Sequence, residues 1–199
     1  MNRAFTLIEL IISIAIFAAM TALVIAKYGS FNQGTIITNM AYDMALTIRT
    51  AQTYGLSVKS TTAGTDNFSS AYGVHFEYDT PTQFIFFADT NSSEHHDHIY
   101  DSDSGEAVTT YAVTQGALIT SICLASQLSD CTDDGSGAIV LDSGDRLDIT
   151  YKRPNPNASF YYRGESVPQP IAFITLTSSD GSNSQVVYVR KNGQISVNN

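Results

Sequence analysis

The chain opens with an apolar segment that is long enough to cross a membrane. From Phe5 to Ala26 nearly every side chain is apolar. As an α-helix rising about 1.5 Å per residue, this segment would span the roughly 30 Å hydrocarbon core of a bilayer. Its polar side chains are three hydroxyls and one carboxylate: Thr6, Ser13, Thr21 and Glu9. We therefore expect one transmembrane helix at the N-terminus, followed by a head on one side of the membrane.

Glu9 is the residue that membrane anchoring alone does not explain. A carboxylate in an apolar span costs about 2.5–3.5 kcal/mol even on the most lenient insertion scale, so it normally has a partner and a function. No Lys or Arg lies within the span. The nearest candidate partner is an α-amino group at the start of the segment, which exists only if the chain is cut there. A secretory signal fits poorly, because its apolar region is shorter and precedes its cleavage site.

The residues around Glu9 resemble the class III signal of type IV prepilins. The matching run is Ala4-Phe5-Thr6-Leu7-Ile8-Glu9-Leu10, with Ala4 in place of the commoner Gly. The resemblance implies a leader peptide at residues 1–4, cleavage between Ala4 and Phe5 by a prepilin peptidase, and N-methylation of Phe5. It also implies that the Phe5 amine neutralises Glu9 of a neighbouring subunit during filament assembly. The alternative is a simple membrane-anchored protein.

Beyond the apolar segment, the pattern predicts that the helix continues and becomes amphipathic. From Thr35 to about Val58, apolar side chains recur at three- and four-residue steps and form one helical face. This face consists of Ile37, Met40 or Ala41, Met44, Ile48 and Ala51. We expect this half of the helix to pack on the head, with Gly29 and Gly34 weakening the helix between the two halves.

The chain after about residue 70 is predicted to form antiparallel β-sheet. Short β-branched or aromatic runs alternate there with Gly, Pro, Asn and Asp clusters. The candidate strands are 72–78, 83–88, 108–114, 117–123, 138–141, 147–152, 159–162, 171–177, 185–190 and 194–197. The turn at 191–193 contains Asn-Gly, which suits a type I′ hairpin.

The expected fold class is α+β: a long N-terminal helix packed on an antiparallel β-sheet head, as in pilins. The expected organisation has three parts. They are a leader peptide (1–4), a transmembrane and filament-core helix (5–34), and an exported globular head that includes the amphipathic half of the helix (35–199).

The order of these pieces resembles the H-type minor pseudopilins and the FimT-like minor pilins. The likeness rests on IRTAQTYG at the helix end, YGVHFEY, FIFFAD and the closing VVYVRKNGQISV. It implies a subunit that assembles through its N-terminal helix into a type IV pilus or a type II secretion pseudopilus. Other pilins, the prepilin peptidase, an assembly platform and its ATPase are the implied partners. The implied location is a single pass in the inner or cytoplasmic membrane, with the head exported, and then the filament.

Two alternative functions remain open, a major pilin of the shaft and a DNA-binding minor pilin for DNA uptake. The formal net charge of −9 argues against general nucleic-acid binding, because phosphate contacts need clustered cations. Arg163, Arg190 and Lys191 are weak candidates for DNA contact. FimT-like proteins that bind DNA carry Gly-Arg-x-Arg near the C-terminus, and the matching stretch 193–196 has neither Arg. We therefore do not expect nucleic acid as a partner.

Cys123 and Cys131 predict a disulfide in an exported domain. A bridge closing so short a loop contributes about 2–3 kcal/mol to stability when it is unstrained. The alternative is two free thiols.

The acidic and histidine-rich stretches are weak metal candidates. His95, His96 and His98 are potential ligands for Zn²⁺ or another transition metal, and Asp101 and Asp103 resemble the start of a calcium loop that lacks its closing Glu. A solvated loop is the alternative, so we expect no cofactor unless it is Ca²⁺. The sequence contains no GxSxG, HExxH or phosphate-binding glycine loop, and we expect no enzymatic activity.

Overall fold

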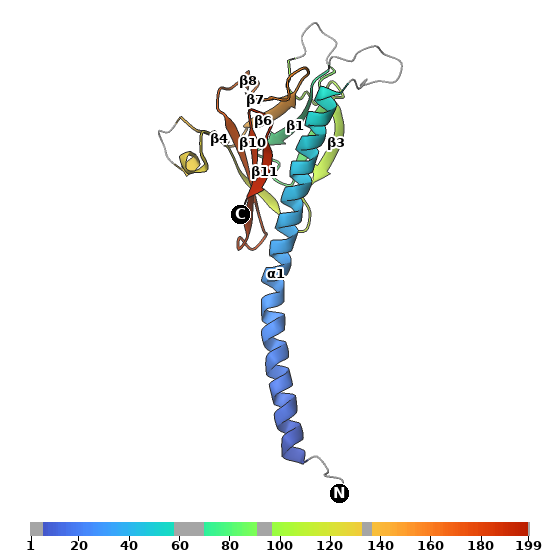
Figure 1. Ribbon diagram of the computed structural model, residues 1–199, viewed down its shortest axis with the longest axis vertical. Helices are drawn as coiled ribbons and strands as arrows, with labels where there is room; N and C mark the ends of the chain where they lie inside the picture. Colours follow the sequence, from blue (N-terminus) through green and yellow to red (C-terminus); the bar gives the residue numbers. More distant parts are fainter. Residues whose placement is uncertain (1–5, 58–69, 91–96, 133–136, 199) are drawn as a thin grey trace.

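One long helix carries a β-rich head. The computed structural model describes residues 6–57, 70–90, 97–132 and 137–198, with the backbone alone at 26–31. Helix α1 runs unbroken from Leu7 to Leu56. Its N-terminal half extends away from the strands, and its C-terminal half lies against them (Figure 1). The fold is therefore α+β and pilin-like, as predicted.

The helix packs on the head through the face predicted from its periodicity. Ile37, Ala41, Met44, Ile48 and Ala51 are all buried. These side chains contact strands of two sheets, because α1 touches β1 and β6 of one sheet and β9, β10 and β11 of the other. The predicted weakening at the two glycines does not break the helix, which continues through both positions.

The first sheet, sheet A, has six antiparallel strands in the order β3-β2-β1-β6-β7-β8. Its strands are β1 (Tyr72–Glu77), β2 (Gln83–Ala88), β3 (Ala107–Ala112), β6 (Arg146–Tyr151), β7 (Ala158–Tyr162) and β8 (Glu165–Ser166). The predicted strands therefore exist, but the sequence did not predict which of them share a sheet.

The second sheet, sheet B, has five antiparallel strands in the order β11-β10-β9-β4-β5. Its strands are β4 (Leu118–Ala125), β5 (Ile139–Val140), β9 (Ile171–Thr177), β10 (Ser184–Arg190) and β11 (Ile195–Asn198), and a short 3-10 helix, η1 (Leu128–Thr132), follows β4. In Figure 1, α1 lies between β11 on one side and β3 on the other.

A single large core joins α1 to both sheets. An aromatic cluster marks its contact with sheet A. The ring of Tyr54 on α1 lies 5.5 Å from that of Tyr72 and 5.7 Å from that of Phe86, measured between centroids. Because this core faces α1, alternate residues of β1 point away from it, and that outer face of sheet A carries the pocket described below.

The closing hairpin exists, but its turn differs from the type I′ prediction. Gly193 N donates to Arg190 O at 2.8 Å, and within the turn only Gly193 has a positive φ, of 86°. A type I′ turn needs positive φ at both central residues. The chain instead turns through Lys191 and Asn192 without positive φ at either residue, and Gly193 then adopts the left-handed conformation.

Candidate functional sites on the helix and the head

The first turn of α1 is closed by Thr6 and Glu9. Thr6 is the N-cap, and Glu9 Oε2 accepts hydrogen bonds from Thr6 N (3.0 Å) and Thr6 Oγ1 (2.7 Å). Glu9 N donates in return to Thr6 Oγ1 at 3.4 Å. This reciprocal pair is a capping box, which satisfies free N–H groups at a helix start. The capping box turns the Glu9 carboxylate back toward the N-terminal end of the helix. The predicted cleavage position, between Ala4 and Phe5, lies outside the described residues.

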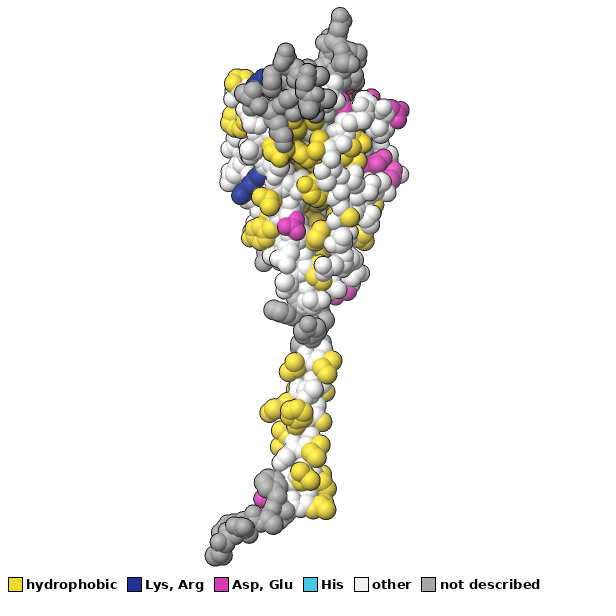
Figure 2. Space-filling model, turned by 90° about the vertical axis from the view of Figure 1, so that its right-hand side faces the viewer, with side chains coloured by type: hydrophobic (Ala, Val, Ile, Leu, Met, Phe, Trp, Pro, Cys, Tyr) yellow, Lys and Arg dark blue, Asp and Glu magenta, His cyan; other side chains and the backbone are white. Residues whose placement is uncertain are grey.

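The N-terminal half of α1 exposes apolar side chains all round. Residues Leu7–Ile25 form a helix that is long and apolar enough to cross a membrane, with a mean hydropathy of 2.5. Leu7 and Phe17 are 74% and 73% exposed, and Figure 2 shows such side chains along the stalk. A helix with this surface needs lipid or other helices around it.

The hydroxyl groups of the apolar span are satisfied within the helix. Ser13 Oγ donates to Glu9 O at 2.7 Å, and Thr21 Oγ1 donates to Phe17 O at 2.8 Å. Such bonds allow Ser and Thr in an apolar environment at little cost. The carboxylate of Glu9 is therefore the polar group of this span that would most need a charged partner in an apolar environment.

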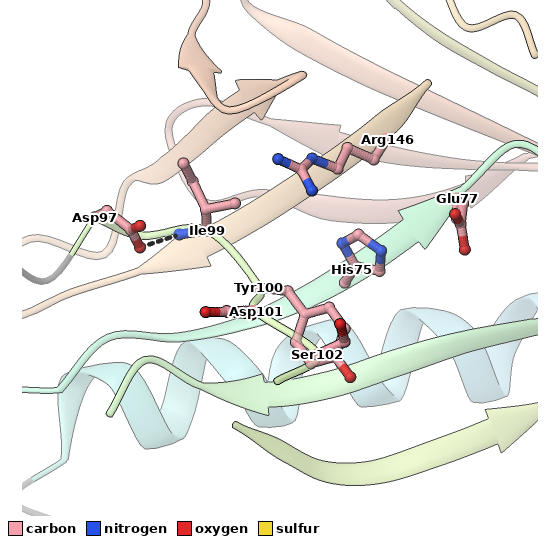
Figure 3. A pocket seen from close by; sticks show the side chains of 8 residues that line it. All are labelled: His75, Glu77, Asp97, Ile99, Tyr100, Asp101, Ser102 and Arg146. Atoms are coloured by element: carbon pink, nitrogen blue, oxygen red, sulfur yellow. Dashed lines mark hydrogen bonds between the residues drawn. The ribbon is translucent and has the colours of Figure 1, made fainter. Parts of the chain in front are cut away.

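A polar pocket of about 380 Å³ lies on the outer face of sheet A. Strands β1 and β6 form its floor, and the segment after residue 96 crosses above them (Figure 3). Its lining residues are His75, Glu77, Asp97, Ile99, Tyr100, Asp101, Ser102 and Arg146. Opposite charges meet here, because Arg146 and Glu77 are direct neighbours across β1 and β6.

A buried His–Asp pair supports this pocket from below. His75 Nδ1 lies 2.7 Å from Asp148 Oδ1, and both side chains are buried. Asp148 Oδ1 also accepts from Tyr100 N at 3.3 Å, and the His75 and Tyr100 rings lie 4.8 Å apart. Burial raises the pKa of Asp148, and the hydrogen bond with His75 opposes that rise. The second oxygen, Oδ2, has no hydrogen-bond partner in the described part of the chain.

Two further buried carboxylates hold the same segment by its backbone. Asp89 Oδ2 accepts from His98 N at 3.2 Å. The two oxygens of Glu106 accept from Thr90 N (3.2 Å) and Asp101 N (2.9 Å). Burial raises the pKa of Glu106, and the nearby Asp89 adds to the rise. Sequence reasoning missed these acids, because a single Asp or Glu between polar residues carries no sign of burial.

The metal candidates do not converge in the described structure. His95 and His96 lie outside the described residues. His98 Nδ1 lies 3.6 Å from Asp89 Oδ2. Asp101 Oδ1 accepts a hydrogen bond from Asp103 N at 3.0 Å. No group of three His, Cys, Asp or Glu side chains that could hold a metal occurs among residues 6–57, 70–90, 97–132 and 137–198. The expectation of no metal or cofactor, Ca²⁺ apart, stays a prediction.

The three basic candidates are divided between the sheets. Arg163, in the turn between β7 and β8, pairs with buried Asp145 through Nε. Lys191 Nζ donates to Val167 O at 3.1 Å. Arg190 is half-buried at the end of β10 in sheet B. Two of the three side chains therefore make bonds within the head.

The predicted disulfide is present. Cys123 on β4 is bonded to Cys131 in η1, with 6.0 Å between their Cα atoms. The bridge ties η1 to sheet B. Cys123 also packs in a small apolar cluster with Phe173 and Ile171 on the outer side of that sheet.

Comparison with known proteins gives a match at the N-terminus. The family model of the prokaryotic N-terminal methylation motif matches residues 1–25. No curated protein and no solved structure matches the chain. The matched residues include the predicted cleavage position, Glu9 and most of the apolar span. The match supports a type IV pilin-like subunit, of the kind that a prepilin peptidase processes and that assembles with other pilins.

Proposed function

We propose that this chain is a minor pilin or pseudopilin of the H type, which assembles through α1 into a type IV pilus or a type II secretion pseudopilus. The observation that carries assembly through α1 is the position of Glu9, whereas the H type rests on the sequence likeness at the helix end and the closing hairpin. Glu9 is the one carboxylate in Leu7–Ile25, it lies within the matched methylation motif, and it is in the first turn of α1.

The mechanism is assembly rather than chemistry. A prepilin peptidase cuts between Ala4 and Phe5 and methylates the new amine. Before assembly, the subunit is anchored in the inner or cytoplasmic membrane with its head exported. As it enters the filament, its Phe5 amine meets Glu9 of a neighbouring subunit. Two opposite charges in an apolar helix bundle stabilise only one alignment, because leaving either unpaired costs about 3–5 kcal/mol.

The division of α1 supports this role. Its N-terminal half has exposed apolar side chains that other helices can cover, whereas its C-terminal half is held by the core of the head. A filament built from such subunits has helices at its centre and heads outside. The basic side chains Arg163 and Lys191 are bonded within the head, so we do not propose DNA binding as a second function.

The test is the intact mass and the N-terminal sequence of the protein recovered from a host with an active prepilin peptidase. We expect a chain that begins at methylated Phe5 and lacks residues 1–4. A chain that begins at Met1 in such a host would contradict the proposal and leave a membrane-anchored head. Scarcity relative to the main subunit in sheared filaments is expected of a minor pilin, and abundance would indicate the shaft subunit.

A further inference from the structure

Among the described residues, strand β3 is an edge of sheet A whose own side chains lack the usual protection against pairing. It forms the end of the strand order and pairs with β2 in the described structure. All six of its residues, Ala-Val-Thr-Thr-Tyr-Ala, are exposed, and none is charged or a proline. Edge strands present free N–H and C=O groups, which proteins normally protect with Lys, Pro or bulges. The β3–β2 register shifts only near one end, between Phe86 and Phe87.

A groove of about 330 Å³ runs beside this edge, between β3 and α1. Met40 and Met44 of α1 line one wall, and Phe84 and Tyr111, whose rings stack at 5.3 Å, line the other. Leu46, on the helix wall, is 62% exposed. Figure 2 looks onto this side of the head and shows apolar side chains gathered on its surface. Methionine walls adapt to different apolar side chains.

The edge and the groove together define the shape of what they bind. Free backbone groups on β3 require an extended strand as the partner. Alternate side chains of such a strand would point to the same face of sheet A as Tyr111, and so into the groove. Because the groove is mainly apolar, we expect the side chains of the partner strand that enter it to be apolar, and strands favour β-branched residues.

The charge of the groove lining indicates which charged side chain the incoming strand carries. Asp43 is the acidic residue that lines the groove, and the described lining residues include no Lys or Arg. A Lys or Arg on the incoming strand would complement it. The other edge strands of this chain, β5, β8 and β11, contain no Lys or Arg. A second copy, at a net charge of −9, is therefore a poor occupant.

We propose that β3 and the adjacent groove bind an extended strand of a different protein by strand addition. That strand is apolar on the side facing Met40 and Met44 and carries a Lys or Arg that reaches Asp43. The proposal does not depend on filament assembly, since the head alone provides every contact.

The first test uses the full-length protein in detergent micelles and a short synthetic peptide in which Val alternates with Thr and one residue is Lys. A matched peptide carries Gln in place of Lys. We expect binding in fluorescence anisotropy, and Asp43→Asn should weaken binding of the Lys peptide about 1.4- to fivefold, as for an exposed ion pair of about 0.2–1 kcal/mol. The Gln peptide should not respond to Asp43→Asn. No binding by either peptide, or an equal response of both, would overturn the proposal.

The second test identifies the edge used. Hydrogen exchange of residues 107–112 should slow when the Lys peptide binds, whereas residues 195–198 of β11, an edge strand of sheet B, should exchange as before. Protection at β11 alone would refute the site. In addition, Thr110→Cys in β3 should not produce disulfide-linked homodimers in native membranes. Efficient homodimer formation would assign the edge to a second copy of this chain and overturn the proposal.

Discussion

His75 Nδ1 lies 2.7 Å from Asp148 Oδ1, in a pair of side chains buried beneath the segment that crosses sheet A. The two residues are directly opposite on β1 and β6. The pair thus joins neighbouring strands, and Asp148 also accepts from the backbone of Tyr100. One carboxylate therefore connects sheet A to the segment that completes the polar pocket.

We predict that Asp148→Ala strongly destabilises the head. Removing one partner of a buried hydrogen bond costs about 1–3 kcal/mol, because the polar groups of His75 and Tyr100 that Asp148 contacts are left buried without it. The free energy of unfolding from urea denaturation of the full-length protein measures this loss. Asp103→Ala is the matched control, since Asp103 is exposed in the same segment and should change stability by about 0.5 kcal/mol or less. Equal losses in the two variants would show that the pair has no special role.

A second prediction concerns the loss of stability in acid. Burial alone would raise the pKa of Asp145, but hydrogen bonds from Tyr162, the Asp142 amide and Arg163 hold that pKa below its ordinary value. The folded state thus binds a proton less readily than the unfolded state. The contribution of the Asp145 carboxylate to the free energy of unfolding is therefore complete above the ordinary Asp pKa of about 4. It is lost as the pH falls below that value.

Asp145→Asn should therefore reduce the free energy of unfolding by about 2 kcal/mol at neutral pH, the scale of hydrogen bonds to a charged group. The difference in the free energy of unfolding between the variant and the parent protein should shrink below pH 4, because the Asp145 carboxylate of the parent becomes protonated there. Urea unfolding at several pH values measures both effects. A difference that stays constant down to pH 2 would contradict the assignment.

The third prediction tests the close approach at the closing hairpin. A Cβ at position 193 would lie 2.3 Å from Pro156 O and 2.5 Å from Gln52 Nε2, at a φ of +86°. The backbone strain of a left-handed residue costs about 1–2 kcal/mol, and the clash adds to it. Gly193→Ala should therefore destabilise more than Gly181→Ala, where φ is +70° and nothing lies within 4 Å. Thermal unfolding of both variants gives the comparison, and equal shifts in Tm would show that the clash is relieved at no cost.

The elements of this fold could be predicted from sequence, but their pairing could not. Helical periodicity identified Ile37, Met44 and Ile48 because their spacing follows one helix face, and those side chains are buried. Sheet membership depends on contacts between distant segments. For example, β1 pairs with β6, and the resulting His75–Asp148 pair joins residues 73 positions apart. No pattern within a short stretch of sequence predicts a pair between residues so far apart.

The same reasoning separates the two candidate sites. Glu9 could be found from sequence because a lone carboxylate in an apolar segment is costly wherever that segment lies. The polar pocket could not, because Asp89 and Glu106 become unusual only through burial by chain far from them. The edge of β3 was likewise hidden, since being last in a sheet is a property of the whole topology.

The last prediction concerns Glu9 itself. Glu9→Leu removes the carboxylate and its bonds to Thr6, and it leaves a neighbouring Phe5 amine without a partner in the filament. Loss of one member of a buried pair costs about 3–5 kcal/mol, so the amount of this subunit in sheared filaments should fall roughly tenfold or more. Cleavage should persist, because the residues on both sides of the predicted cut are unchanged. Immunoblotting of filament and membrane fractions measures assembly, and intact mass measures processing.

Ser13→Ala is the matched control in the same span, since Ser13 bonds only to Glu9 O in the described structure. It should assemble as the parent does. Glu9→Asp keeps the charge on a shorter side chain and should recover part of the assembly, which distinguishes a need for charge from a need for the capping bond. If Glu9→Leu entered filaments at the parent level, the amine–carboxylate pairing would be wrong. Packing of the apolar helices alone would then have to align the subunits.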